Sequence, residues 1–212
     1  MDSGTRVIFI ANPNNPTGTY NTHEEVHSLL KKVPSSVLVV LDCAYFEYVT
    51  KDDYVRPIDL LNKFDNLLIT KTFSKIHGLA SIRVGYGVAN PSLVEALNRI
   101  RQPFNVNTIA QAMACKAIND HEHIRKSMEL NSQQYEFLFD QLSTLGLDCI
   151  PSVGNFITFK GNFVGKEIFD SLMKKGVIVR CVDLYDMKDY IRVTIGTEAE
   201  NLKFLRALED LL

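Results

Sequence analysis

Short apolar runs alternate with segments of helical periodicity along the first half of the chain. Val7–Ile10, Val37–Asp42 and Leu67–Thr70 are unbroken apolar runs, which indicates strands that are covered on both faces. Residues 23–32 and 57–64 lie between these runs, and their apolar positions recur at helical spacing. The alternation predicts βαβ units and a mainly parallel sheet, so the expected fold class is α/β.

A fourth strand is predicted at Arg83–Ala89. The loop before it is too short for a helical crossover, so this strand is expected to run antiparallel to its neighbour. Asn90 and Pro91 then form an N-cap and first-turn pair for a helix that extends to about Arg101. Thr22 with Glu25 similarly forms a capping box for the first helix.

The pattern changes from Asn107 onward, where helical segments dominate. Residues 107–119 and 121–144 are predicted helices, and the second is long enough to join two lobes. A compact α+β unit follows, with strands at 156–160, 177–180 and 190–195, a helix at 166–175 that ends at Gly176, and a last helix opened by Thr197 with Glu200. We therefore expect two domains, residues 1–120 and residues 121–212.

Composition narrows the class of protein. The chain has 212 residues, of which 46% are hydrophobic and 23% are charged, enough to bury a sizeable core. The net charge is −2 and the basic residues are dispersed, which argues against nucleic-acid and anionic-membrane partners. No apolar run approaches the roughly 20 residues of a bilayer span, so a cytoplasmic protein is expected. The four cysteines form no CxxC pair and are predicted to be reduced thiols that pack in the interior.

Chemically suggestive side chains follow three of the predicted strands. Asn15 lies in ANPNNPTG after the first strand, Asp42 and Tyr45 lie in LDCAY at the end of the second, and Lys75 follows the third. In an open parallel sheet the ligand crevice lies beyond the carboxyl ends of the strands. We therefore expect these four side chains to meet at one rim.

An amine, a carboxylate, a phenol and an amide around one pocket suit a particular cofactor chemistry. A lysine amine can condense with a carbonyl cofactor, and an aspartate can keep a pyridine nitrogen protonated so that the ring withdraws electrons. Thr72, Ser74 and Arg83 supply donors and charge for a phosphate. The set describes a pyridoxal 5′-phosphate site.

Each of these residues also has a structural interpretation when it is taken alone. Lys75 could be a solvated loop residue, Tyr45 a packed aromatic ring, and NPNNPTG only a turn. His77 is interpreted as structural, because Lys75 already fills the place of a base. The HEH triplet at 121–123 cannot turn successive side chains to one helix face, so no metal site is predicted.

Three motifs in this order resemble the signature of fold-type I aminotransferases of the aspartate aminotransferase superfamily: NPNNPTG, DCAY, and an SK pair with an arginine eight residues after the lysine. A finer resemblance is to the histidinol-phosphate aminotransferase family. TFSKIHGLASIRVGYG, NFI from Asn155 and IRVTIGT from Ile191 carry it. The resemblance covers essentially the whole chain and implies a parallel-sheet large domain followed by a small α+β domain.

The resemblance also implies roles for individual residues. Lys75 would bind the cofactor covalently and move the proton during the reaction, and Asp42 would pair with the pyridine nitrogen. Tyr45 and Asn15 would contact the ring oxygen. The phosphate would be held by Thr72, Ser74 and Arg83, while Arg192 would receive a substrate carboxylate and Arg180 would meet the substrate's other end.

The implied reaction is amino transfer between L-histidinol phosphate and 2-oxoglutarate in histidine biosynthesis, by a homodimer. An aromatic aminotransferase or a threonine-phosphate decarboxylase would share nearly every residue named. The family's chains also carry a substantial segment before NPNNPTG, so the resemblance implies an N-terminally truncated chain with an exposed apolar face or edge and weakened cofactor binding. A non-catalytic truncated product is the remaining alternative.

Overall fold

The computed structural model describes residues 1–212, and the chain divides into two compact units. One comprises Met1–Pro13 and Tyr20–Arg125, and the other comprises Asn14–Thr19 and Lys126–Leu212. Each unit has its own four-stranded sheet. None of the helices combines the length and the apolar composition that a membrane span requires.

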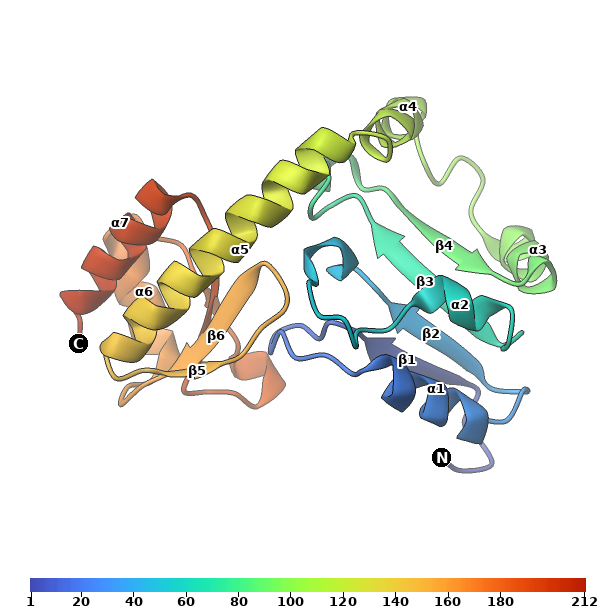
Figure 1. The fold of residues 1–212 in the computed structure, drawn as a ribbon, viewed down its shortest axis with the longest axis horizontal. Helices are drawn as coiled ribbons and strands as arrows, with labels where there is room; N and C mark the ends of the chain where they lie inside the picture. Colours follow the sequence, from blue (N-terminus) through green and yellow to red (C-terminus); the bar gives the residue numbers. More distant parts are fainter. The chain divides into compact units, whose positions relative to one another are not determined.

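The sheet of the first unit has the order β1-β2-β3-β4 (Figure 1). Strands β1 (Val7–Ala11), β2 (Leu38–Asp42) and β3 (Leu67–Thr72) are parallel. Strand β4 (Gly85–Ala89) pairs antiparallel with β3, which confirms the prediction made from the short loop.

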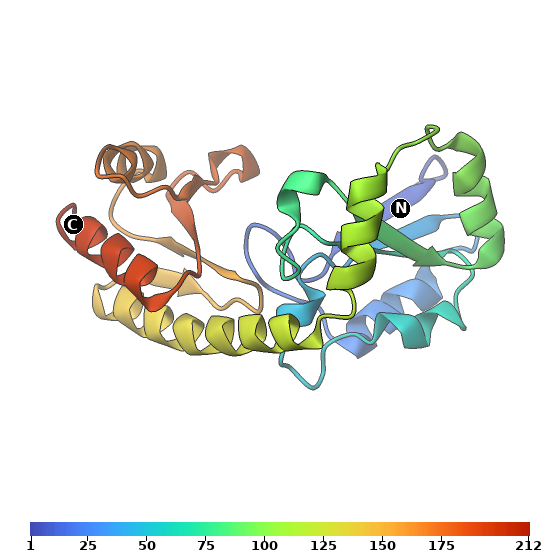
Figure 2. The same ribbon diagram turned by 90° about the horizontal axis from the view of Figure 1, so that it is seen from above.

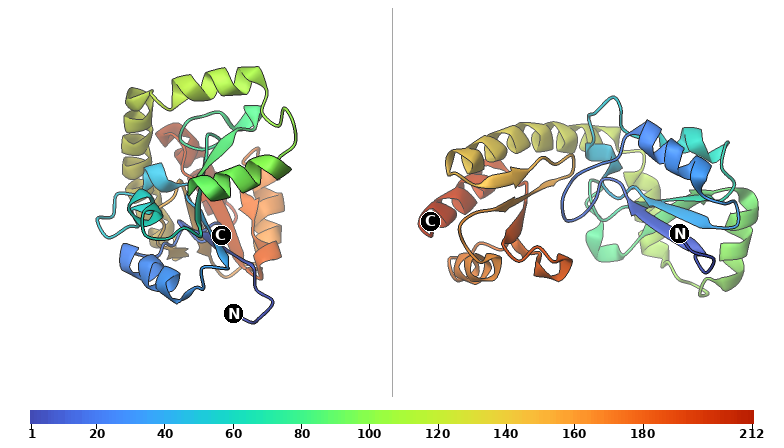
Figure 3. Two further views of the ribbon diagram at one scale, coloured as in Figure 1. Left: turned by 90° about the vertical axis from the view of Figure 1, so that its right-hand side faces the viewer. Right: turned by 90° about the horizontal axis from the view of Figure 1, so that it is seen from below.

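Helices α1 (His23–Lys32) and α2 (Pro57–Leu61) lie side by side over one face of this sheet, as the views from above and below show (Figures 2 and 3). The capping box of Thr22 and Glu25 is present at the start of α1. A buried apolar cluster joins the two helices to the strands; it includes Val26, Leu30, Val39, Leu41, Leu60, Leu67 and Ile69.

The opposite face of β1 is open. Val7 and Phe9 are 42% and 77% exposed, whereas Ile8 and Ile10 pack against the cluster under α1 and α2. The prediction that this strand is covered on both faces is therefore wrong for the described residues, whereas the expected exposed apolar face is present. An unbroken apolar run gives the two faces the same composition, so it cannot tell which face is covered.

Short helices complete the first unit. The 3-10 helices η1 (Phe46–Tyr48) and η2 (Ala80–Ile82) lie in the loops after β2 and β3. Helix α3 (Pro91–Ile100) is capped by Asn90, which accepts a hydrogen bond from the Ser92 amide at 3.1 Å. Helix α4 (Thr108–Ala117) and the long helix α5 (His121–Thr144) follow, close to their predicted bounds, and α5 belongs to the second unit from Lys126 onward.

The sheet of the second unit is antiparallel, with the order β5-β6-β8-β7. Its elements are β5 (Asp148–Ile150), β6 (Phe156–Lys160), α6 (Gly165–Lys174), β7 (Arg180–Cys181), η3 (Asp183–Tyr185), β8 (Tyr190–Thr194) and α7 (Glu198–Glu209). Strand β5 was not predicted. The strand predicted at 177–180 is wrong in its bounds, because Val177 and Val179 are buried in the core outside the ladder.

Alternate residues of β6 and β8 face different surroundings. Ile157, Phe159, Ile191 and Val193 join a core with residues of α5, α6 and α7. Phe156, Thr158 and Arg192 therefore lie on the other face, because successive side chains of a strand point to opposite sides.

The segment Asn14–Thr19 packs with the second unit, which the sequence pattern did not indicate. The Thr158 hydroxyl donates to the Pro16 carbonyl, and the Val153 amide donates to the Gly18 carbonyl at 2.9 Å. Gly18 has φ +77°, and a Cβ at this position would overlap the Ser152 hydroxyl. Glycine is therefore required here for two reasons, backbone conformation and close approach.

We predict that Gly18→Ala lowers the free energy of unfolding by about 3 kcal/mol, because the methyl group adds a clash to the cost of a left-handed backbone. Gly146→Ala is the matched control, since Gly146 also has φ +77° but has nothing within 4 Å of the added Cβ. The control should lose only about 1 kcal/mol. Urea unfolding followed by circular dichroism measures both, and equal losses would contradict the predicted clash.

Candidate functional site

Asp42 ends β2 at the carboxyl edge of the parallel sheet. Its side chain is exposed, and Thr70 of the neighbouring strand β3 donates a hydrogen bond to Asp42 Oδ1 at 3.3 Å. Register explains the contact, because Asp42 and Thr70 are paired residues of parallel strands. The carboxylate is thus oriented by the next strand while it stays open to a ligand.

Lys75 and Tyr45 lie close together although 30 positions separate them. Lys75 Nζ is 5.2 Å from the centroid of the Tyr45 ring, and Tyr45 is only 5% exposed. A cation over an aromatic face is attracted by the ring quadrupole, which orients the amine. The loops after β2 and β3 therefore bring the predicted lysine and phenol together.

The three predicted phosphate-binding residues form a chain of contacts that begins at the last residue of β3. Thr72 Oγ1 accepts a hydrogen bond from the Ser74 amide at 3.0 Å, and Arg83 Nη1 lies 3.4 Å from Ser74 Oγ. Arg83 also donates to the Ala80 carbonyl at 2.8 Å, and its backbone has φ 54°. The guanidinium forms no ion pair with a carboxylate, so its charge remains available to an anion.

Backbone hydrogen bonds close the lysine loop on itself. The Phe73 amide donates to Val84 and the Leu79 amide donates to Phe73, at 3.1 and 2.9 Å. The ring Nε2 of His123, in the first turn of α5, lies 2.8 Å from the Ile76 carbonyl oxygen. The residue after Lys75 is thus held from a distant part of the chain.

His77 is a buried side chain whose surroundings suit packing. Its ring lies 4.9 Å from the Phe73 ring, and its Nδ1 has no hydrogen-bond partner. Burial lowers the pKa of His77, so the neutral imidazole is favoured. These surroundings agree with the structural interpretation.

The second unit carries a row of polar side chains across three strands. Arg180 of β7 and Thr158 of β6 are both paired with Arg192 of β8. Residues directly opposite one another share a face, roughly 5 Å apart at Cβ. The two arginines are therefore neighbours of like charge on the face that also carries Phe156.

The guanidinium of Arg192 uses only part of its hydrogen-bonding capacity. Nη1 donates to Asn15 Oδ1, and the guanidinium carbon lies 4.8 Å from the Phe156 ring centroid. Nε is buried without a partner. Since neither guanidinium has a carboxylate partner, the pair is suited to an anionic ligand that would relieve the repulsion and occupy the free donor.

The predicted site residues thus fall into two groups. Asp42, Tyr45 and Lys75 lie in the first unit with the predicted phosphate-binding residues, and Asn15, Arg180 and Arg192 lie in the second. The meeting of Asn15 with the lysine group stays a prediction.

Sequence reasoning missed Thr70, Phe156 and Thr158. The period-2 pattern of β3, which sets Thr70 and Thr72 on one face, could have indicated the first of them. Thr158 carries no signal of its own, because it lies within an otherwise apolar run, and Phe156 was noted only as part of the NFI motif.

The cysteines take no part in either group. All four are free, and burial raises the pKa of Cys43 to about 12, so its thiol stays protonated. Cys115 is exposed, which makes the predicted packing role wrong for that residue. No cluster of three or more metal-ligating side chains is found.

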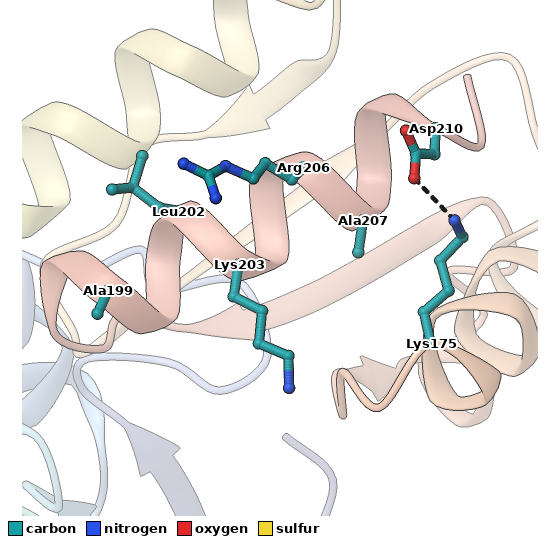
Figure 4. A pocket seen from close by; sticks show the side chains of 7 residues that line it. All are labelled: Lys175, Ala199, Leu202, Lys203, Arg206, Ala207 and Asp210. Carbon is teal, nitrogen blue, oxygen red and sulfur yellow. Dashed lines mark hydrogen bonds and ion pairs between the residues drawn. The ribbon is translucent and has the colours of Figure 1, made fainter.

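A pocket of the second unit is lined by residues of α7, by Asp210 after it and by Lys175, which follows α6 (Figure 4). Lys175 forms an ion pair with Asp210 at 2.9 Å, and Lys203 donates to the Gly176 carbonyl at 3.0 Å. None of the predicted site residues lines it, and two of its cations already have partners.

Comparisons with known proteins identify the fold and the family. A Thermus thermophilus aspartate aminotransferase mutant has a TM-score of 0.87 at 19% identity, over 100% of this chain and 61% of that one, which concerns the fold alone. A structure of histidinol-phosphate aminotransferase from Sinorhizobium meliloti in complex with pyridoxal-5′-phosphate has a TM-score of 0.88 at 27% identity, over 97% and 58%. The architecture is therefore that of the fold-type I transferases, as predicted.

A family model for aminotransferase class I and II matches residues 1–208, and the chain belongs to this family. The histidinol-phosphate aminotransferase of Caldicellulosiruptor saccharolyticus is 47% identical over 212 residues. That match covers 100% of this chain and 59% of the relative's length.

The buried His77 generates a pH prediction. Its lowered pKa means that below about pH 6.5 the unfolded chain binds more protons than the folded one, so stability falls as the pH falls through this window. His77→Gln should reduce the difference in unfolding free energy between pH 7.5 and 5.5. His121→Gln, at an exposed position, should keep the wild-type difference. Identical pH dependence in His77→Gln and wild type would contradict the argument.

Proposed function

We propose that this chain carries the cofactor-binding and substrate-binding residues of a pyridoxal 5′-phosphate-dependent aminotransferase. The observation that carries the proposal is the arrangement in the first unit, where the Lys75 amine lies over the Tyr45 ring and an exposed carboxylate, Asp42, ends strand β2. Membership of the aminotransferase class I and II family supports the same reaction class.

The residues of the first unit fit this cofactor. Bound pyridoxal 5′-phosphate supplies an aldehyde that condenses with amines and a pyridine ring that withdraws electrons when it is protonated. Asp42 would hold the ring nitrogen in its protonated form, and Tyr45 would hydrogen-bond the ring oxygen together with Asn15. Arg83, which has no carboxylate partner, would bind the phosphate with Thr72 and Ser74.

Lys75 would have two functions. Its amine would be the attachment point of the cofactor, and once released it would move the proton at the substrate's Cα. The Tyr45 ring orients the amine, while the closed loop limits the positions that Nζ can reach. Attachment and proton transfer thus use one well-oriented nitrogen.

The paired arginines support dianionic substrates. Arg180 and Arg192 lie opposite each other, and the buried Nε of Arg192 lacks a partner. L-Histidinol phosphate presents a phosphate and 2-oxoglutarate presents two carboxylates, so the same guanidinium pair could receive each in turn. We therefore propose amino transfer between L-histidinol phosphate and 2-oxoglutarate, as the names of the relatives suggest.

The setting follows from this reaction and from the resemblance. The protein would act in histidine biosynthesis in the cytoplasm, as a homodimer, on small amino-acid and oxo-acid substrates. Threonine-phosphate decarboxylation and aromatic amino transfer use nearly the same residues, so the ligand preference of the arginine pair separates the three reactions.

Covalent labelling tests the cofactor assignment. After incubation with pyridoxal 5′-phosphate, the Lys75 amine and the aldehyde should have joined with loss of water, and borohydride should reduce the new carbon–nitrogen bond to a stable amine. Peptide mapping is expected to find the label on Lys75, and Lys75→Ala should lose it. Lys166→Ala, at an exposed lysine of α6, is the control that should keep it. A label spread over surface lysines would contradict the assignment.

Calorimetry of the cofactor-loaded chain tests the arginine pair. Arg180→Gln should weaken L-histidinol phosphate binding by about tenfold, because a charged hydrogen bond to the phosphate is worth about 1.5 kcal/mol or more. Binding of L-histidinol, which lacks the phosphate, should be unchanged. Arg206→Gln, in the pocket of Figure 4, is the matched control.

Two outcomes would contradict the substrate proposal. Equal effects of Arg180→Gln on the binding of L-histidinol phosphate and of L-histidinol would show that Arg180 does not bind the phosphate. Tighter binding of L-threonine phosphate than of L-histidinol phosphate would favour the decarboxylase.

A further inference from the structure

A partly buried ion pair joins β3, the strand that leads to Lys75, to the 3-10 helix η1. Lys71 Nζ and Glu47 Oε1 are 2.5 Å apart, and their side chains are only 18% and 15% exposed. The Arg99–Glu95 pair, by contrast, has side chains that are 72% and 67% exposed. Exposed ion pairs contribute little to the free energy of folding, whereas two charges that are screened from water interact strongly with each other.

The pair lies on the face of β3 opposite to the candidate site. Lys71 shares the face of Leu67 and Ile69, which pack under α1 and α2, while Thr70 and Thr72 lie on the other face. Neither charge of the pair is therefore directed to the side where Asp42 lies.

Lys71 contacts two consecutive residues of η1. Besides the contact with Glu47, its Nζ lies 3.9 Å from the Phe46 ring centroid. Phe46 itself packs against the apolar cluster of the first unit. The ammonium group is therefore held between a carboxylate and an aromatic face, a more directional arrangement than a lone ion pair.

The two partners flank the site residues in the sequence. Tyr45 immediately precedes η1, and Lys71 immediately precedes Thr72, four residues before Lys75. The ion pair therefore ties the segment that carries Tyr45 to the strand that carries the lysine loop. A hydrogen bond from the Cys43 amide to the carbonyl of Thr70, the residue before Lys71, joins the same two segments at 2.8 Å.

We propose that Glu47 and Lys71 are a positioning pair that fixes the Tyr45 ring and the Lys75 amine relative to each other. The inference rests on the proposed function only in that Lys75 is the residue to which the cofactor attaches. Both residues act through their neighbours and neither would touch the cofactor. Loss of one partner leaves an uncompensated charge in a partly buried place, so the two segments would separate to admit water.

Hydrogen exchange of the chain without added cofactor tests the positioning directly. In Lys71→Met and in Glu47→Gln, the amides of residues 43–48 and 72–79 should exchange roughly tenfold faster, the size expected for a coupled pair. Amides of β6 and β8 should be unchanged. Lys71→Arg should keep wild-type exchange, because it restores the charge and the contact. Lys166→Met, which breaks an exposed pair in α6, is the matched control.

Pyridoxal 5′-phosphate binding gives the second measurement. The dissociation constant should rise about tenfold in Lys71→Met and return to within about twofold of wild type in Lys71→Arg. Wild-type exchange in both uncharged variants, or faster exchange throughout the chain, would overturn the proposal. Absence of cofactor binding by the wild type would instead overturn the proposed function, while the exchange pattern would still decide the positioning.

Discussion

The parallel register between β2 and β3 is the constraint on which the candidate site depends. It sets Asp42 opposite Thr70, so the carboxylate ends its strand beside a hydroxyl donor and faces away from the helices. A shift by one residue would turn Asp42 toward the apolar cluster under α1 and α2, because strand side chains alternate. The same register brings the loops that carry Tyr45 and Lys75 to one edge of the sheet. Packing of Val39, Leu41, Leu67 and Ile69 therefore determines where the candidate site residues lie.

In each sheet one face packs against helices and the other carries the candidate site residues. In β3, Leu67 and Ile69 pack inward and Lys71 pairs with Glu47 on that side, while Thr70 and Thr72 lie on the side of the candidate site. In the second unit, the core residues of β6 and β8 alternate with Thr158 and Arg192. A half-satisfied guanidinium costs free energy without a ligand, and the aromatic contact with Phe156 offsets part of that cost.

Much of the fold could be predicted from local patterns. Helix α5 and the caps formed by Thr22 and Asn90 agree with the structure, since each depends on residues close in sequence. Strand β5 was missed because three residues give no periodicity. Strand β7 was misplaced because the apolar run that contains Val177 and Val179 resembles a strand, although both valines pack in the core outside the ladder. Contacts such as Lys71–Glu47, His123–Ile76 and Arg192–Asn15 join distant segments, so no local pattern could reveal them. The choice of site residues came from the family resemblance together with their positions at strand ends.

A structure of the chain crystallised with pyridoxal 5′-phosphate would test the central claim most directly, namely that the strand ends of the first unit form the cofactor site. The account predicts continuous density between Lys75 Nζ and the cofactor, with an Asp42 carboxylate oxygen about 2.8 Å from the pyridine nitrogen. Arg83 should contact the phosphate. Cofactor density attached to another lysine, or bound away from the carboxyl ends of β2 and β3, would contradict it.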